Sequence, residues 1–453
     1  MHTRRDFLKT AGLTGLGLAA GTRLEAATYA KARRVLIVGA GMAGLAAAYR
    51  LQQGGVAVTL LEAANRIGGR MHTHQIDPEQ DLRIEFGAEW IGASHTRFME
   101  LSREMGLEWH NNQFDTHLIY QGAYSPAGQW SYSPAFNDLF TGRIEAYAAL
   151  TNKDIRRLDN MDWWRYLQQA GATGRDLEIR GLLDSTDFGE SIRFVSAYSA
   201  LAEYAESSPK NEMDYKLVGG NSRLPEALAD KIGRDHIRLQ HRVVSIAQSG
   251  EGVQVRCQNG STFEADRLIC TAPTFALQQI DWQPALPPEQ VEALRALQYA
   301  RIIKVALLCS ERFWGDESFD MITDGYGHYF YHATKTQPGP RGVLISYSTG
   351  DKAEAMAAQN QAGKRQIVLD ALRPAFGDVS DKIIKIQSYY WGNDPYSMGS
   401  YALYGRGQWT TVMPVLRQRH KRVYFAGEHL ADWQGFMEGA INTGEEAANA
   451  ILG

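Results

Sequence analysis

The segment between residues 33 and 70 limits the fold of this chain more than any other stretch of it. A short apolar run, residues 35–38, has the composition of a buried parallel strand, and Gly39, Gly41 and Gly44 follow it in the spacing G-x-G-x-x-G. The next residues have a helical pattern, and a second apolar run ends at Glu62. Strand, glycine turn, helix, second strand and acid in this order predict a βαβ unit that binds a dinucleotide.

Each residue of this pattern has its own physical task. Gly39 permits a tight turn, Gly41 lets the backbone approach a pyrophosphate, and Gly44 allows the helix to pack closely on the strand. The free N–H groups at the start of the helix and the helix dipole favour the negative charge of the pyrophosphate. Glu62 ends the second strand, where its carboxylate can accept hydrogen bonds from a ribose.

The residues after Glu62 indicate which dinucleotide is bound. Gly68 and Gly69 give a second close approach of the backbone, and Arg66 and Arg70 on either side can contact phosphate. This tail resembles the FAD-binding two-dinucleotide flavoproteins rather than the NAD dehydrogenases. FAD is therefore the expected cofactor.

The composition is that of a soluble globular protein with more than one domain. A chain of 453 residues exceeds one compact core, and its formal net charge of −4 with no long basic run gives no support to a nucleic-acid partner. Cys257, Cys270 and Cys309 lie in or beside apolar runs, so they are expected to be buried thiols rather than disulfides. No Cys/His cluster has the spacing of metal ligands, and no metal is expected.

Residues 1–30 have the features of an export signal. Arg4 and Arg5 form a twin-arginine pair, and residues 10–20 are a mildly apolar run too short to span a membrane. Twin-arginine signals address bacterial proteins for export, so we expect the twin-arginine machinery as a partner and a periplasmic or secreted protein.

The chain is expected to form two discontinuous domains of an α/β protein. The first is a Rossmann-like FAD-binding domain of the two-dinucleotide, glutathione-reductase type, and the second is an interleaved α+β substrate domain. Residues 136–205 have a mostly helical pattern, and pocket walls are expected from residues 136–204. The predicted FAD domain comprises residues 31–80, 210–283 and 392–453, and the predicted substrate domain residues 81–209 and 284–391.

Several separate motifs together resemble those of the flavin-containing amine oxidases, the family of monoamine, polyamine and L-amino-acid oxidases. The match runs from about residue 33 to residue 453. Besides the FAD fingerprint, the motifs are residues 86–90 (FGAEW), 219–225 (GGNSRLP), 303–305 (IKV), 397–401 (SMGSY) after Trp391, 425–428 (FAGE) and 435–440 (GFMEGA).

The resemblance implies roles for individual residues. Lys304 corresponds to the family lysine that holds a water against flavin N5, and a lysine inside an apolar strand is costly to bury without a partner. Trp391, Tyr401 and Phe436 would form aromatic walls near the flavin, with Trp90 facing the substrate. The implied FAD contacts are Gly39, Gly41, Ala43, Gly44, Glu62, Ala63, Gly69, Arg70, Gly87, Ala88, Glu89, Trp90, Val243, Trp391, Gly427, Glu428, Gly435, Phe436 and Met437.

The chain also departs from the family in informative ways. Ser400 stands where some monoamine oxidases have the cysteine that bonds to the flavin, so FAD is expected to be non-covalent. Phe436 replaces the second tyrosine of the aromatic cage. Trp90 stands where many L-amino-acid oxidases have a carboxylate-binding arginine, which favours amines without an α-carboxylate, while Arg97 keeps the amino-acid alternative open.

The implied reaction is oxidation of a C–N bond. The α-hydrogen of a neutral primary or secondary amine would pass as hydride to flavin N5, and the imine would be hydrolysed to an aldehyde or ketone. O₂, giving hydrogen peroxide, or a periplasmic electron carrier would reoxidise the flavin. The alternatives are an L-amino-acid oxidase, a carotenoid-type desaturase or porphyrinogen oxidase, and an FAD-containing binding module without activity. A homodimer stays an open alternative to a monomer.

Overall fold

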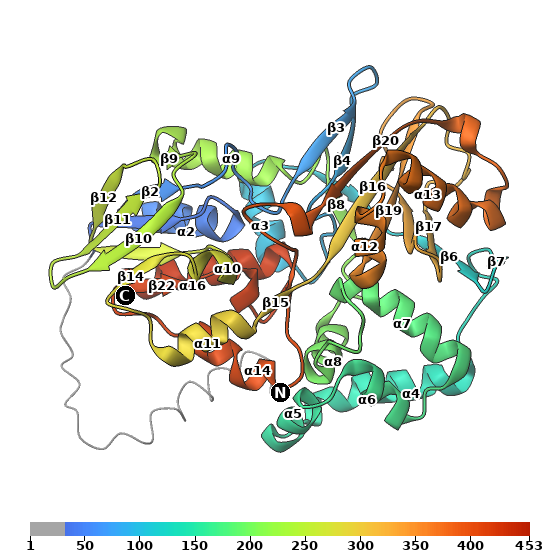
Figure 1. Ribbon diagram of the computed structural model, residues 1–453, viewed down its shortest axis with the longest axis horizontal. Coiled ribbons are helices and arrows are strands. Elements are labelled where there is room, and N and C mark those ends of the chain that lie inside the picture. Colours follow the sequence, from blue (N-terminus) through green and yellow to red (C-terminus); the bar gives the residue numbers. More distant parts are fainter. Residues whose placement is uncertain (1–31) are drawn as a thin grey trace.

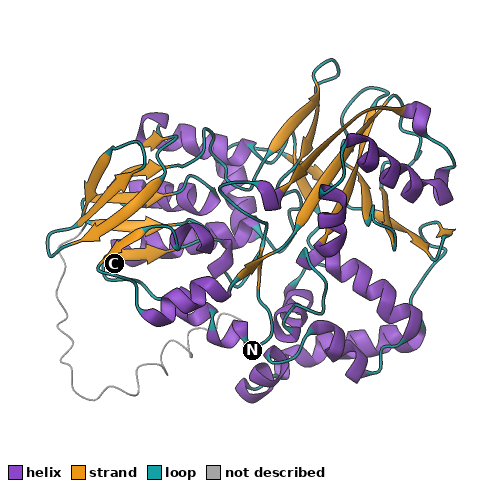
Figure 2. Ribbon diagram, in the orientation of Figure 1, coloured by secondary structure: helices purple, strands orange, loops and turns teal. Residues whose placement is uncertain are grey.

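The structure is a computed structural model, and it describes residues 32–453. The predicted signal of residues 1–30 lies outside the described residues. Figures 1 and 2 show two groups of strands joined by long connections, with a cluster of helices beside them. Among residues 32–453, no helix is both long and apolar enough to cross a membrane.

The glycine-rich segment begins a parallel sheet of five strands, in the order β22-β13-β1-β2-β9. β1 is buried at four of its five residues because helices pack on it, and its apolar composition fits that burial. The helices α2, α9 and α16 pack on this sheet through small and aliphatic residues. The elements are β1 (Arg34–Val38), α2 (Met42–Gln53), β2 (Ala57–Leu61), α9 (Arg223–Ile232), β9 (Ile237–Arg238), β13 (Arg267–Cys270), β22 (Val423–Phe425) and α16 (Met437–Leu452).

A mixed sheet of four strands lies beside the parallel sheet, in the order β12-β11-β10-β14. In the chain, the short helix α10 precedes β14 and the helix α11 follows it (Figure 1). The elements are β10 (Val243–Gln248), β11 (Val253–Cys257), β12 (Thr262–Ala265), α10 (Thr274–Leu277), β14 (Asp281–Gln283) and α11 (Pro288–Ala296).

The third large sheet has seven strands, in the order β20-β16-β19-β18-β17-β6-β7, and its two faces have different partners. Alternate residues of β16, including Ile303 and Val305, pack under α12 and α13, while Ile302 and Ala306 face the opposite side. Lys304 shares that opposite side. The elements are β6 (Asp115–Tyr120), β7 (Ala123–Ser125), β16 (Ile302–Cys309), β17 (Phe319–Thr323), β18 (Tyr329–His332), β19 (Gly342–Thr349), α12 (Gly350–Ala357), α13 (Gln361–Phe376) and β20 (Ile383–Tyr390).

The predicted helical stretch forms a cluster of helices below the seven-stranded sheet in Figure 1. Its last two members, α7 and α8, carry side chains that reach the candidate site. The helices are α4 (Pro134–Glu145), α5 (Asn152–Asp159), α6 (Trp163–Ala170), α7 (Gly174–Phe188) and α8 (Ala197–Glu206).

The predicted α/β class with a parallel sheet is confirmed. The strands of the five-stranded and four-stranded sheets lie within the predicted FAD domain, and those of the seven-stranded sheet lie within the predicted substrate domain. Three two-stranded sheets join residues of both predicted domains. The boundary at residues 80 and 81 cuts the hairpin of β3 (Thr73–Asp77) and β4 (Leu82–Glu85), because its two strands pair through the turn between them. β5 (Trp109–Asn111) pairs with β8 (Tyr215–Leu217), and β15 (Gln298–Tyr299) pairs with β21 (Ala402–Leu403), also across the division.

The three cysteines are buried and free, as predicted. Burial raises the pKa of the Cys270 and Cys309 thiols to about 12, so both stay protonated at neutral pH. They act as small apolar core residues.

Candidate active site

A cavity of about 780 Å³ lies between the parallel sheet, the seven-stranded sheet and the ends of α7 and α8. It begins at the glycine turn after β1 and reaches β17 and β18. All of the predicted FAD contacts and aromatic walls except Gly44 line it, whereas Arg66 and Arg97 do not. The structure therefore brings together residues that lie as far apart in the sequence as Gly39 and Met437.

Two glycines of the turn, Gly39 and Gly44, are required by the backbone of the protein itself. Gly39 has a φ of +102°, a backbone conformation that residues with a side chain rarely adopt. A Cβ on Gly44 would lie 2.0 Å from the Gly39 carbonyl oxygen, so Gly44 permits the close packing of α2 that was predicted for it. Gly44 lies behind the turn, and its prediction as a residue in contact with the cofactor is corrected.

Gly41 differs from its neighbours because nothing in the protein demands a glycine there. Its φ is −78°, and an added Cβ would meet only the Gly69 Cα, at 3.9 Å. Gly41 lines the cavity at the start of α2, where backbone N–H groups are free of helical partners. The free space therefore suits a ligand that must approach the backbone closely.

Glu62 directly follows β2 beside this turn. Its carboxylate accepts hydrogen bonds from the backbone N–H groups of Ala40 and Ala64, both at 2.8 Å. Burial raises the pKa of Glu62, although these hydrogen bonds act in the opposite direction. The acid is thus fixed in position at the cavity wall, next to Ala63.

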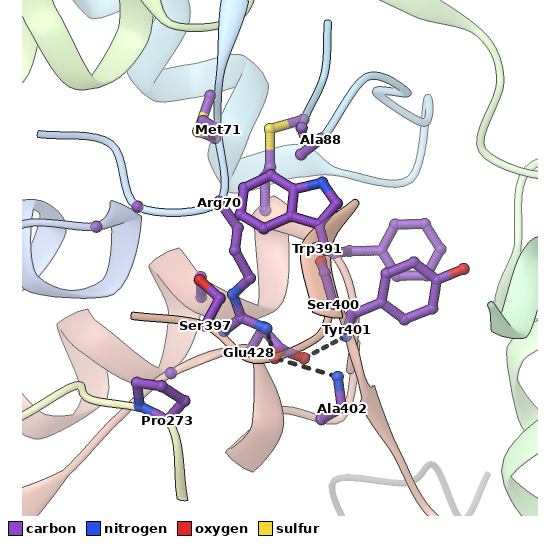
Figure 3. A pocket seen from close by; sticks show the side chains of 18 of the residues that line it. Arg70, Met71, Ala88, Pro273, Trp391, Ser397, Ser400, Tyr401, Ala402 and Glu428 are labelled. Atoms are coloured by element: carbon purple, nitrogen blue, oxygen red, sulfur yellow. Dashed lines mark hydrogen bonds and ion pairs between the residues drawn. The ribbon is translucent and has the colours of Figure 1, made fainter. Parts of the chain in front are cut away.

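The second glycine pair is held by one arginine and flanked by another. Arg66 donates to the backbone carbonyls of Ile67, Met71 and Gly69 and so stabilises the loop. Its guanidinium does not line the cavity, so the predicted contact of Arg66 with phosphate is wrong. Arg70 points into the cavity toward Glu428 and forms an ion pair with it (Figure 3).

Glu428 in turn fixes the C-terminal motif. One carboxylate oxygen accepts from the Ala402 N–H at 3.3 Å, and the other from the Gly435 N–H at 2.8 Å. Burial alone would raise the pKa of Glu428, but the Arg70 guanidinium keeps it below its ordinary value. The predicted contact of Glu428 with the cofactor stays a prediction.

These residues fit a dinucleotide. Two helices, α2 and α16, begin at the cavity wall, and their N-terminal N–H groups favour phosphate or a polarised carbonyl. Gly41 leaves space that a side chain would fill, and an acid that can accept from a ribose is fixed beside it. The cavity lining also includes Val243, the first residue of β10.

Lys304 is buried in a network of charges. Its Nζ donates to the backbone carbonyls of Glu85 and Gly87, at 3.0 and 2.9 Å, and to the Glu89 carboxylate at 2.9 Å. Lys216 donates to the other oxygen of Glu89, also at 2.9 Å. Burial lowers the pKa of Lys304, and Glu89 opposes that shift.

This network bears on the predicted role of Lys304. All three of its N–H donors have protein acceptors, so Lys304 anchors the loop of residues 85–89 to β16. The predicted water-holding role stays a prediction, because a water would have to accept one of these donors.

Aromatic side chains line the middle of the cavity. The Trp391 indole donates to the Phe86 carbonyl at 2.8 Å, and Figure 3 places its ring next to Tyr401. The Tyr401 hydroxyl lies within hydrogen-bond distance of the carbonyls of Thr186 and Asp187 at the end of α7. Trp90 contacts the Tyr331 ring, and its buried indole N–H has no hydrogen-bond partner within residues 32–453.

The walls from residues 136–204 were expected without named side chains, and the structure supplies them. Arg180 and Asp187 line the cavity from α7 and Tyr204 lines it from α8, while Asp184 is buried behind them. Arg180 forms an ion pair with Asp184 at 2.6 Å. The spacing i, i+4 and i+7 on α7 is the sequence signal that could have identified this charged face.

Arg97 does not line the cavity. It lies on α3 (Thr96–Glu104) and forms ion pairs with Glu445 at 2.8 Å and Glu100 at 3.0 Å. The prediction of Arg97 as a carboxylate clamp is therefore wrong, because its guanidinium is directed to α16 and to its own helix.

The model of one protein family, described as flavin containing amine oxidoreductase, matches residues 42–452. This match covers nearly all of the described chain. The chain belongs to the flavin-containing amine oxidoreductases.

Individual members of this family resemble the chain over most of its length. It is 28% identical to an L-amino-acid oxidase of Demansia vestigiata and 27% identical to amine oxidase [flavin-containing] B of Sus scrofa. Each alignment covers 92% of this chain and 86% of the relative.

Solved structures share the fold of this flavin-containing amine oxidoreductase. A putrescine oxidase double mutant superposes with a TM-score of 0.84 at 21% identity, and cyclohexylamine oxidase from Brevibacterium oxydans with 0.83 at 23%. Both cover 93% of this chain and 99% of their own.

Two further observations concern what this family member can hold. Ser400 lines the cavity, and none of the three described cysteines does. Within residues 32–453 no group of His, Cys, Asp and Glu side chains is arranged to hold a metal ion.

Proposed function

We propose that this flavin-containing amine oxidoreductase is an FAD-dependent oxidase of amines that lack an α-carboxylate. The observation that carries the proposal is the charge of the cavity wall. Arg70 is paired with Glu428, Arg180 with Asp184, and Arg97 lies elsewhere. The remaining arginine that lines the cavity, Arg242, precedes Val243 of β10 and donates to Gln279. Among residues 32–453, no unpaired guanidinium is therefore found beside the aromatic residues to bind a substrate carboxylate.

The cofactor-side residues would hold FAD through backbone and helix termini. The Gly39–Gly41 turn and the start of α2 would receive the pyrophosphate, Glu62 the ribose, and the start of α16 at Met437 the flavin ring. When bound, FAD supplies the two-electron acceptor that amine oxidation requires. Ser400 and the distant cysteines support non-covalent binding, because no thiol lines the cavity.

The protein side chains would orient the amine and exclude water. Trp391, Tyr401 and Phe436 would hold the carbon that is oxidised between apolar rings, which favours the neutral amine over its ammonium form. The C–N single bond becomes C=N, and water hydrolyses it. An amine, O₂ and water thus give an aldehyde or ketone and hydrogen peroxide, with ammonia released from a primary amine and a primary amine released from a secondary one. A periplasmic electron carrier is the alternative acceptor.

Anaerobic bleaching of the yellow flavin absorbance tests this function. Reduction by primary or secondary amines but not by L-amino acids is the expected result. Reduction by L-amino acids alone would overturn the proposal in favour of an L-amino-acid oxidase, which some relatives are. Release of FAD from acid-denatured protein into the supernatant would support non-covalent binding, and flavin that stays with the pellet would contradict it.

We also propose export by the twin-arginine route to the periplasm. Arg4 and Arg5, with the short apolar run after them, support it. Cell fractionation of a variant with Arg4→Lys and Arg5→Lys tests it: retention in the cytoplasm is expected, and unchanged export would contradict the proposal.

A further inference from the structure

Two buried lysines share one buried carboxylate beside the cavity. Lys216 Nζ donates to Glu89 Oε1 and Lys304 Nζ donates to Glu89 Oε2, both at 2.9 Å. None of the three side chains is more than 4% exposed. Lys304 and Glu89 line the cavity, whereas Lys216 does not. Lys216 can therefore act on a bound group only through Glu89 and through its charge.

The hydrogen bonds of Lys304 fix its charge. Its Nζ has three oxygen acceptors, the backbone carbonyls of Glu85 and Gly87 and the Glu89 carboxylate. A neutral amine has only two N–H donors, so three acceptors around Nζ require the ammonium form. Glu89 is the group that offsets the cost of burying this charge.

Glu89 can compensate only one of the two ammonium groups. Its other partner is neutral, since the Tyr331 hydroxyl donates to Oε2. Lys216 also donates to the Ala333 carbonyl, at 3.2 Å, which carries no charge. Within the described residues, neither lysine has a second carboxylate at ion-pair distance. One positive charge of this group is thus left over.

Glu85, the other acid of this loop, removes that excess only in part. Its carboxylate accepts from the Thr73 hydroxyl at 2.9 Å and from the Asn221 N–H at 2.8 Å, and forms no ion pair within residues 32–453. Burial raises the pKa of Glu85 to about 7, although Lys216 opposes the rise. The carboxyl is therefore partly protonated at neutral pH.

We propose that Lys216 is a positioning residue for the redox reaction of the flavin: with Lys304 and Glu89 it places an uncompensated positive charge beside the cavity, and this charge makes bound FAD easier to reduce. Two electrons and one proton turn the neutral flavin ring into an anion, which a nearby positive charge stabilises. Solvent ions screen a buried charge only weakly. The inference goes beyond the function proposed above and does not depend on which amine is oxidised.

The reduction potential of bound FAD tests the inference without any substrate. The FAD-loaded protein is reduced anaerobically at pH 7 beside a dye of known potential, and absorbance gives the ratio of oxidised to reduced flavin. Lys216→Met should raise this ratio by about tenfold at a fixed dye potential, which corresponds to about 30 mV for a two-electron couple. Lys231→Met removes an exposed lysine from α9 and should leave the ratio within about twofold.

A double variant separates the charge from the structure. Lys216→Met leaves the Glu89 carboxylate with one donor fewer, so a purely structural role predicts more damage when Glu89 is changed as well. If the charge decides, adding Glu89→Gln to Lys216→Met leaves Lys304 uncompensated again. The ratio should then return to within about twofold of the wild type.

Lys216→Gln, which keeps a donor for Glu89, takes the place of Lys216→Met if that variant does not fold. An unchanged ratio in the single variant would overturn the inference, and so would a double variant that stays at the ratio of the single one. Flavin reduction by L-amino acids alone would overturn the proposed function and leave this inference standing.

Discussion

At the glycine turn the cavity wall is mainly backbone, whereas at α7 and β17 it consists of charged and hydroxyl-bearing side chains. The first end is specified by the absence of side chains, as at Gly41, and by N–H groups at helix starts. At the second end, the carboxylate end, Arg180 is paired with Asp184, while Asp187 and Asp320 line the cavity and form no ion pair within residues 32–453. One cavity can therefore bind the same cofactor at one end and different substrates at the other. Substitutions of the side chains at α7 and β17 leave the backbone of the glycine turn unchanged.

The largest expected effect is at the backbone end. Gly41→Ala should weaken FAD binding by about a hundredfold or more, because the new methyl group occupies space that the pyrophosphate needs. The apoprotein should fold normally, since the methyl group meets no protein atom closer than 3.9 Å. Flavin content after gel filtration and the FAD dissociation constant measure the effect.

Two other glycines sharpen this result. Gly142→Ala in α4, where an added Cβ meets nothing within 4 Å, should leave the flavin content unchanged and raise the stability by up to about 1 kcal/mol, because alanine is the better helix former. Gly44→Ala should lower the thermal stability even of the apoprotein, because its Cβ would clash with the Gly39 carbonyl. A Gly41→Ala protein with wild-type flavin content would contradict the claim that the cofactor needs the open space at Gly41.

The next effect belongs to the carboxylate end and depends on pH. Burial raises the pKa of Asp320 to about 7, so the folded protein holds a proton there that the unfolded chain releases near pH 4. The free energy of unfolding should therefore fall as pH rises from 4 to 7. Burial raises the pKa of Asp187 and Glu85 to about 7 as well, so Asp320→Asn should reduce this fall rather than abolish it. It should stabilise the protein at pH 8 by about 1–3 kcal/mol, with little effect at pH 5. Urea unfolding at both pH values measures it.

Asp138→Asn is the control for this prediction. Asp138 lies on the exposed surface of α4, so the effect should be small and equal at pH 5 and pH 8. Destabilisation by Asp320→Asn at pH 8 would mean that the ionised carboxylate is satisfied in the folded protein, which would contradict the picture of an unmatched acid.

The smallest effect is expected outside the cavity. Arg97→Ala should lower stability by less than about 1 kcal/mol, because its ion pairs are partly exposed. Flavin reduction by amines should not change. Arg234→Ala, which removes a similar surface pair with Glu226, is the matched control. A selective loss of reduction by an L-amino acid in Arg97→Ala would restore the amino-acid alternative.

The backbone end could be predicted from the sequence because its rules are local. Gly39, Gly41 and Glu62 keep a fixed spacing within one βαβ unit, so their placement follows from the order of elements. Gly44 was predicted both to pack the helix on the strand and to contact the cofactor, and the structure shows only the packing. The same spacing serves both tasks, so the sequence does not separate them. Arg66 was misassigned because nearby carbonyls compete with phosphate for a guanidinium.

The carboxylate end could be predicted only in outline. Whether Asp187 is left unmatched depends on Arg180 and Asp184 forming a pair, and on where α7 lies against β17, which are properties of tertiary packing. Asp320 did carry a signal, because a charged residue interrupts the apolar run of its strand just as Lys304 interrupts another. The apolar run around each residue predicts a functional buried charge at Lys304 and equally at Asp320, for which none was expected.

The Glu89 network also constrains the order in which the chain can fold. Glu89 is 127 residues from Lys216 and 215 residues from Lys304, yet it contacts both. During synthesis Glu89 emerges long before either lysine, so the loop of residues 85–89 lacks its anchor until β16 has left the ribosome. Contacts of such sequence separation form slowly because the intervening chain must first be ordered. Assembly of the flavin-side loop is therefore a late event that follows synthesis of about two thirds of the chain.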